Sequence, residues 1–264
     1  VVERAVEAAH LLSPVATCAD TEALQAPIPP PQDRAVRERV DALRERLASA
    51  RALRSAGRYA DARRSLADPA ASLEGLEYAP AKAEALLEWG VLERESGEFA
   101  AAEDTLFRAA WAAEEGHHDA IAAAVWMHLA RTVGYNQNRY DEGLKHAQQG
   151  EAKLVRAGRD PALAADLEAT FAIILSERGS FAEAETRFAR ALEMSIETSG
   201  ERSLPVGRLH TGLGVALLEQ GRYDEARRAF ERSIEISSER VGPAHPRVAR
   251  PIYNLGETLR RLQR

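Results

Sequence analysis

The fold of this chain is decided by the stretch Leu213-Gly214-Val215-Ala216-Leu217-Leu218-Glu219-Gln220-Gly221-Arg222-Tyr223-Asp224-Glu225-Ala226. Apolar residues recur at helical spacing as far as Leu218, and Gly221 then interrupts the pattern, as glycine commonly does at the C-terminus of a helix. A second amphipathic segment begins at Tyr223 and continues through Ile234. The stretch therefore predicts two helices joined by a tight turn.

The same turn recurs along the chain with an aromatic residue two positions after the glycine and a small residue three further on. The copies are Gly57…Tyr59…Ala62, Gly97…Phe99…Ala102, Gly179…Phe181…Ala184 and a degenerate Asn138…Tyr140…Gly143. Successive turns, near 57, 97, 138, 179 and 221, lie 40, 41, 41 and 42 residues apart. A fixed period of this length indicates a repeated supersecondary unit, here a helix pair. We expect the aromatic residue to wedge between the two helices of a pair, and Phe188, Phe230 or Leu106 to fill the hollow against the next pair.

Prolines mark where the first helix of each pair begins, because proline is tolerated in the first turn of a helix. They are Pro80, Pro161, Pro205 and Pro246. Asp33 and Asp160 stand where N-caps are expected. The sequence thus predicts an all-α fold, a right-handed α-solenoid of antiparallel helix pairs over residues 33–264 with an unpaired terminal helix at 246–264. Residues 1–32 are expected to form an N-terminal helix and a proline-rich connector.

Composition and charge exclude several classes of function. The net charge is −6 with acids and bases interleaved, which argues against nucleic-acid binding because that requires a basic face. No apolar run approaches the roughly 18 residues that a membrane span needs. The single cysteine, Cys18, excludes an internal disulfide. Because the chain begins with Val1, we expect it to be part of a longer intracellular, cytoplasmic protein.

The sequence shows no constellation that points to catalysis, so we expect neither an enzyme nor a bound cofactor. The histidines lack the H-E-x-x-H spacing of zinc enzymes, and no cysteine accompanies them. They are therefore interpreted as solvated or capping residues. Gly212-Leu213-Gly214 resembles half of a dinucleotide fingerprint, but it lies inside a predicted helix, where glycines favour close helix packing.

The repeats resemble the tetratricopeptide repeat, and specifically the long form found in kinesin light chains. The resemblance covers about residues 34–264 and is closest from Gly200 to Gln263, where the opening stretch leads into Gly242-Pro243-Ala244-His245-Pro246 and Tyr253-Asn254-Leu255-Gly256. The period is longer than the 34 residues of the standard repeat. The copy at Asn138 departs from the pattern, because Arg131 and Gly143 replace the usual small residues. We expect irregular packing there.

A second resemblance concerns the opening segment. Leu12-Ser13-Pro14, Ala16-Thr17-Cys18-Ala19-Asp20 and Pro29-Pro30-Pro31 are similar to the joint that follows the catalytic domain in bacterial serine/threonine kinases with a tetratricopeptide tail. None of the kinase motifs is present in this chain. The resemblance implies a non-catalytic, regulatory part of such a kinase.

The repeat family implies a concave groove that binds a protein or peptide segment. Its groove-facing positions correspond here to Glu84, Arg94, Glu95, His128, Tyr135, Asn136, Glu177, Arg208, Glu219, Arg250, Tyr253, Asn254 and Glu257. Asn254 matches a family asparagine that holds the backbone of a ligand, since its amide both donates and accepts. Two alternatives stay open: the array docks onto or dimerises its own attached kinase, or it is the sensor arm of a transcription regulator.

Overall fold

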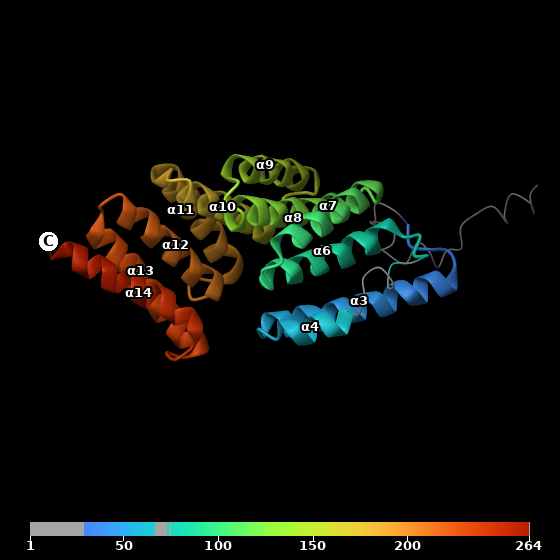
Figure 1. Ribbon diagram of the computed structural model, residues 1–264, viewed down its shortest axis with the longest axis horizontal. Helices are drawn as coiled ribbons and strands as arrows, with labels where there is room; N and C mark the ends of the chain where they lie inside the picture. The colour runs from blue at the N-terminus through green and yellow to red at the C-terminus, as the bar shows by residue number, and fades with distance from the viewer. Residues whose placement is uncertain (1–28, 67–72, 74, 264) are drawn as a thin grey trace, which may run out of the picture.

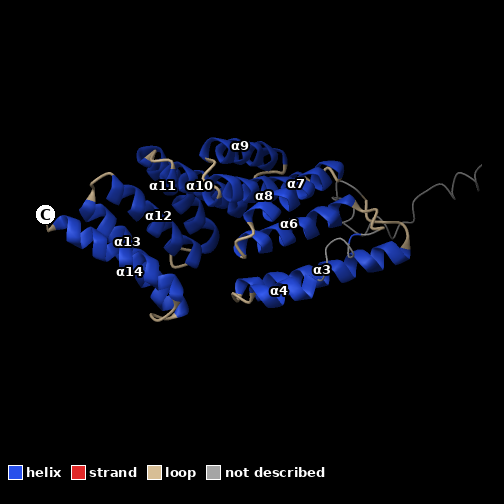
Figure 2. Ribbon diagram, viewed as in Figure 1, coloured by secondary structure: helices blue, strands red, loops and turns tan. Residues whose placement is uncertain are grey.

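The computed structural model describes residues 29–66, 73 and 75–263, so the N-terminal helix and most of the proline-rich connector expected for residues 1–32 lie outside the described residues. Elements carry the labels of Figure 1. They are α3 (Arg34–Ser55), α4 (Tyr59–Leu66), α6 (Ala79–Glu95), α7 (Phe99–Glu115), α8 (Asp119–Leu129), the π-helix η2 (Ala130–Asn136), α9 (Tyr140–Arg156), α10 (Pro161–Glu177), α11 (Phe181–Ser199), α12 (Leu204–Glu219), α13 (Tyr223–Val241) and α14 (Pro246–Leu262). No strand occurs in this part of the chain (Figure 2). The predicted all-α class, an α-solenoid of antiparallel helix pairs, is confirmed.

The helix pairs stack side by side into an arch. In Figure 1, α9 lies at the top, and the two ends of the array, α3 with α4 and α13 with α14, come down on the same side. Each first helix also contacts the first helix of the following pair, as α6 does α8 and α10 does α12. The first helices therefore line one continuous side of the array.

The turns adopt the backbone that the repeated glycine requires. Gly57, Gly97, Gly179 and Gly221 have φ angles of 75°, 84°, 88° and 76°, and Asn138 occupies the third turn of the chain with φ 60°. Asparagine tolerates this left-handed conformation better than other residues with a side chain. The second helix then begins at the aromatic residue, and the alanine three positions on, as in Ala226, is completely buried.

Side chains cap the helices at several of the predicted positions. The Asp33 carboxylate accepts from the backbone N–H of Ala35 at 2.7 Å, and that of Asp160 accepts from Leu163 at 2.7 Å. Two histidines act in the same way: Nδ1 of His118 accepts from the N–H of Ile121, and Nδ1 of His245 from that of Arg247. The N-cap prediction is confirmed for both aspartates, and these two histidines are capping residues.

The large apolar side chains fill gaps that glycines leave. A Cβ at Gly212 would lie 2.5 Å from the ring of Phe188, so this ring reaches the following pair as predicted. The ring of Phe230 lies against Gly214 of its own pair, where a Cβ would be 2.6 Å away, and its cluster also includes Leu255 of the following helix α14. Leu106 likewise packs against Gly90 of its own pair and belongs to one cluster with Leu129 of α8. A glycine in the first helix lets the facing side chain sink into the crossing, so these residues hold pairs together.

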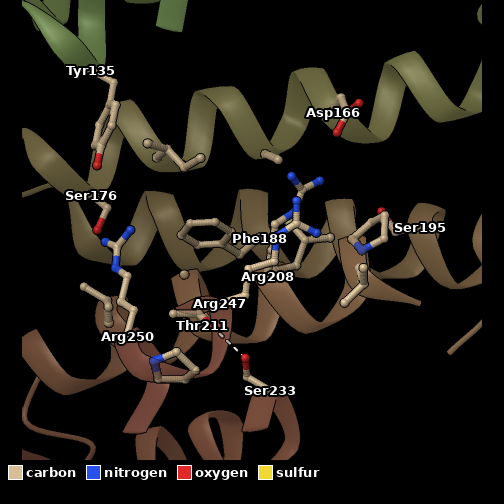
Figure 3. A pocket seen from close by; sticks show the side chains of 18 of the residues that line it. Tyr135, Asp166, Ser176, Phe188, Ser195, Arg208, Thr211, Ser233, Arg247 and Arg250 are labelled. Carbon is tan, nitrogen blue, oxygen red and sulfur yellow. Dashed lines mark hydrogen bonds between the residues drawn. The ribbon is translucent and has the colours of Figure 1, made fainter. Parts of the chain in front are cut away.

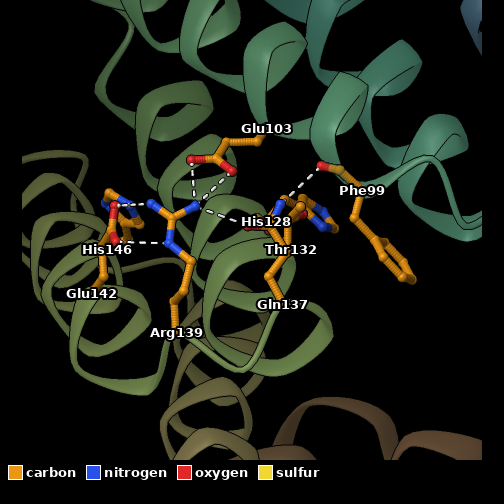
Figure 4. Close-up of polar contacts among 8 residues, drawn as sticks. All are labelled: Phe99, Glu103, His128, Thr132, Gln137, Arg139, Glu142 and His146. Atoms are coloured by element: carbon orange, nitrogen blue, oxygen red, sulfur yellow. Dashed lines mark hydrogen bonds and ion pairs between the residues drawn. The ribbon is translucent and has the colours of Figure 1, made fainter.

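The repeat at Asn138 is irregular, as predicted. Its first helix changes from α to π geometry at Ala130, and the N–H of Gln137 bonds to the carbonyl of Thr132 at 3.1 Å. Gln137 Nε2 donates to the carbonyl of Phe99, and Arg139 bridges Glu103 and Glu142 (Figure 4). These bonds join the irregular segment to α7 of the preceding pair. Single-turn π segments are rare and frequently occur at functional sites.

Candidate peptide-binding pocket

A pocket of about 400 Å³ lies between α10 and α12. Its lining also includes Arg94 of α6, Arg131 and Tyr135 of η2, and Arg247 and Arg250 of α14. Residues from α11 and α13 close its base, among them Phe188 and Ser195. Because the first helices of successive repeats supply most of the lining, the pocket lies on the side of the array that these helices form.

The pocket lining mixes apolar side chains, such as Phe188, Ile173 and Leu209, with arginines and hydroxyl groups (Figure 3). Phe188 lies at the centre, with Arg208 on the Asp166 side of the ring in this view and Arg250 on the other side, next to Ser176 and Tyr135. The hydroxyl groups of Thr211 and Ser233 form a hydrogen bond with each other, with 2.7 Å between the two oxygens. An apolar floor with a few converging polar groups is the usual form of a ligand site.

Positive charge dominates the walls. Five arginines line the pocket, namely Arg94, Arg131, Arg208, Arg247 and Arg250, against two carboxylates, Asp166 and Glu177. Burial lowers the pKa of Arg131 to about 10; the Asp166 carboxylate opposes this change, and the guanidinium groups of Arg94 and Arg208 add to it. Burial likewise lowers the pKa of Arg94. Arginine side chains are cationic at neutral pH, so the pocket favours a ligand that carries negative charge.

Five of the thirteen residues predicted to face the groove line this pocket. They are Arg94, Tyr135, Glu177, Arg208 and Arg250. The other eight do not line it: Glu84, Glu95, His128, Asn136, Glu219, Tyr253, Asn254 and Glu257. The surroundings of these eight side chains differ from what the family pattern implies.

Four of those eight are carboxylates that pair with arginines of the chain itself. Glu84 binds Arg44 at 2.9 Å, and Glu95 lies 3.4 Å from Arg54 and 3.2 Å from Arg94. Glu219 and Glu257 pair with Arg261 at 3.5 and 2.8 Å. Arg260 and Arg261 also hold the pKa of Glu257 at about 2, far below its ordinary value. These groups already have partners within the chain.

The remaining four differ in burial. Tyr253 is 76% exposed on α14. His128, Asn136 and Asn254 are instead partly buried, and each holds one buried polar atom, Nδ1, Oδ1 and Nδ2 respectively, that has no hydrogen-bond partner in the described part of the chain. The Asn254 carbonyl accepts from Thr258 Oγ1 at 2.7 Å. A role for Asn254 in binding a ligand backbone stays a prediction.

The sequence projection missed Arg131 and Arg247 as pocket residues. Arg131 stands where the other repeats carry a small residue, and this departure was the available signal. A long charged side chain at such a position needs open space. Arg131 lies in the π-helix η2 and lines the pocket. Arg247 follows Pro246 in the first turn of α14, where the repeat pattern makes no demand, so no signal pointed to it.

His128 makes the stability of the array depend on pH. Burial, with repulsion from Arg94, Arg131 and Arg54, lowers its pKa well below the ordinary 6.5. Below pH 6.5 the unfolded chain therefore binds a proton that the folded chain does not. We expect the free energy of unfolding to fall as the pH drops from 7 to 5, by up to about 1.4 kcal/mol per pH unit for this one group.

Urea denaturation at several pH values measures this slope. His128→Gln should reduce it, whereas His117→Gln, at an exposed position between α7 and α8, should leave it unchanged. An equal slope in the His128→Gln variant and the wild-type protein would contradict the assignment.

Other kinds of site are not indicated by the described residues. No group of three or more His, Cys, Asp or Glu side chains is placed to hold a metal ion in the part of the chain that the structure describes. Likewise, none of the described helices is long and apolar enough to cross a bilayer.

Comparison with known proteins agrees with the repeat architecture. The family model of the tetratricopeptide repeat matches residues 161–239 and, in an overlapping second match, residues 206–264. A comparison with curated proteins gives no match. The fold is similar to that of BtubC (BKLC) from P. vanneervenii, with a TM-score of 0.62, 19% identity and coverage of 88% of this chain and 85% of that one.

A second similar structure is a putative kinesin light chain of Podosopora anserina with nearly identical TPR-like repeats. Its TM-score is 0.55 at 17% identity, and the match covers 76% of this chain and 97% of that one. At these identities the similarity concerns the fold. Residues 161–264 thus match the tetratricopeptide repeat family, and the described chain as a whole shares the fold of these kinesin-light-chain-like repeat structures.

Proposed function

We propose that this chain is a non-catalytic interaction scaffold that binds a peptide or protein segment in the pocket between α10 and α12 and along the adjoining first helices. Tetratricopeptide repeats are protein-interaction modules, and stacked helical repeats use their concave surface for binding. The observation that carries the proposal is a pocket to which η2, α10, α12 and α14 all contribute. A peptide side chain in this pocket can therefore contact all four elements, while the flanking residues follow the adjoining first helices.

Peptide selection tests this proposal. Peptides of twelve random residues are selected on the immobilised protein, and their dissociation constants are measured by fluorescence anisotropy. Arg208→Ala with Arg250→Ala should weaken binding at least about 10-fold, because each truncation removes a cationic contact of the kind that often dominates an interface. Both side chains are exposed, so the far-UV circular dichroism should not change.

The matched control is Arg190→Ala. Arg190 is an exposed arginine of α11 that does not line the pocket. Its replacement should leave the affinity unaltered. Equal affinities for the wild-type protein and the double variant would place binding elsewhere on the array.

A finer proposal is that the scaffold serves a bacterial kinase to which it is attached in the cytoplasm. It is supported by the resemblance of residues 12–31, most of which lie outside the described residues. The longer protein with and without residues 34–264 should differ in kinase activity or in oligomeric state, measured by light scattering. Identical kinase activity and an identical number of subunits per particle would rule this role out.

A further inference from the structure

The arginines of the pocket form a cationic cluster inside an acidic protein. The chain has a net charge of −6, yet five arginines and only two carboxylates line this one cavity. The arginines come from three separate parts of the array, α6 with η2, then α12, then α14. Their charges act on one another, since Arg94 and Arg208 both lower the pKa of Arg131. Such mutual repulsion costs free energy in the empty pocket.

Most of these guanidinium groups have no partner. Among the described residues, the side chains of Arg131, Arg208, Arg247 and Arg250 form no hydrogen bond and no ion pair within 4.0 Å. Arginines that do not line the pocket behave differently: Arg54 binds Glu88 at 2.7 Å, and Arg187 binds Glu168 at 2.9 Å. The pocket therefore presents several guanidinium groups that no carboxylate of the described chain neutralises. Arg131 is half-buried, where a charge is normally paired, and a bound anion would supply acceptors to it and to the exposed Arg208 and Arg250.

The number and directions of the donors distinguish between kinds of anion. A carboxylate carries one charge on two coplanar oxygens and suits a single bidentate arginine. A phosphate monoester carries a charge of about −1.5 to −2 on three oxygens that point in different directions. It can therefore accept from guanidinium groups that approach from η2, α12 and α14. Tyr135 and Ser176 add neutral hydroxyl donors beside Arg250 (Figure 3).

The floor of the pocket suits the remainder of such a ligand. Phe188, which lies between Arg208 and Arg250 in Figure 3, offers apolar surface against which the β-carbon and backbone of a modified residue would pack, and Ile173 adds to the apolar lining. The volume of about 400 Å³ accommodates one side chain with its phosphate and leaves the flanking residues to follow the first helices.

We propose that this arginine pocket receives a phosphorylated serine or threonine side chain of the peptide segment that the array binds. The inference rests on the proposed function, because the phosphate is borne by that segment. Arg208 and Arg250, on opposite sides of Phe188, hold the phosphate group, and Arg131 provides positive charge from the deeper wall.

Three pools of fluorescein-labelled degenerate heptapeptides test the inference. Their central residue is phosphoserine, serine or glutamate, and all other positions are random. Anisotropy titrations on the wild-type protein should give a dissociation constant at least about 10-fold lower for the phosphoserine pool than for either other pool. Arg208→Gln with Arg250→Gln should raise the constant of the phosphoserine pool to that of the serine pool, and the control Arg190→Gln should preserve the difference.

Three other outcomes would each contradict part of the account. If the glutamate pool binds with the same dissociation constant as the phosphoserine pool, the pocket selects negative charge in general and the phosphate assignment is wrong. If all three pools bind equally and the double variant weakens all three, the phosphate assignment fails while the proposed function stands. If no pool binds the wild-type protein, both fail.

Discussion

Gly143→Ala is expected to lower the free energy of unfolding by about 2–3 kcal/mol. Gly143 in α9 lies against Gly134 in η2, and a Cβ at position 143 would be 2.3 Å from the Gly134 Cα and 2.7 Å from its backbone nitrogen. The obstacle is backbone, so no side-chain rotation relieves it and the two helices must separate. The intrinsic helix preference of alanine, about 1 kcal/mol over glycine, offsets only part of this cost.

The control for Gly143→Ala is the same substitution at Gly256. Gly256 lies inside α14, and a Cβ there would have nothing within 4 Å. Gly256→Ala should therefore stabilise the protein by up to about 1 kcal/mol. Urea denaturation followed by far-UV circular dichroism measures both changes. A stabilising or neutral Gly143→Ala would show that the contact between η2 and α9 is not close.

Phe230→Ala is expected to cost about 3–5 kcal/mol, since the side chain is completely buried and its loss leaves a cavity. The ring lies over Gly214, and its cluster includes Leu217, Ala226 and the half-buried Leu255 of α14. Glycine at 214 leaves nothing that could fill the space. Because repeats contact only their neighbours, α12 to α14 should unfold before the rest of the array.

Two probes are needed to measure the Phe230→Ala effect. Far-UV circular dichroism reports the whole array in urea, and hydrogen exchange reports the helices separately. The control is Val155→Ala, at a side chain that is 48% exposed, which should change the free energy of unfolding by no more than about 0.5 kcal/mol. A cost below about 1 kcal/mol for Phe230→Ala, or unfolding that begins at α3, would contradict this packing.

The sequence predicts the helices of this fold well because short-range chemistry dictates where they end. The left-handed turn at Gly221 excludes most other residues, and Pro161 and Asp160 act on the first turn of α10 alone. Such effects involve a few neighbouring residues, so they can be read from the sequence. The turn at Asn138 can also be predicted, since asparagine tolerates the left-handed backbone conformation that glycine adopts at the other turns.

The candidate site is less predictable because it depends on contacts between repeats. Glu84 and Glu257 occupy groove-facing positions of the family, yet arginines of this chain pair with them. Arg131 lines the pocket from the π-helix η2, and no local sequence signal predicts the π geometry of that segment. The glycine that each ring meets also depends on the helix crossing, since Phe188 lies against Gly212 of the following pair and Phe230 against Gly214 of its own.

Photo-crosslinking of a selected peptide tests the binding surface most directly. p-Benzoylphenylalanine is placed at Glu177, an exposed residue of the pocket lining, or at Trp111, which is 70% exposed on α7 and does not line the pocket. If the pocket binds the peptide, the Glu177 position crosslinks to it and the Trp111 position does not. Crosslinking from Trp111 with none from Glu177 would contradict binding in the pocket.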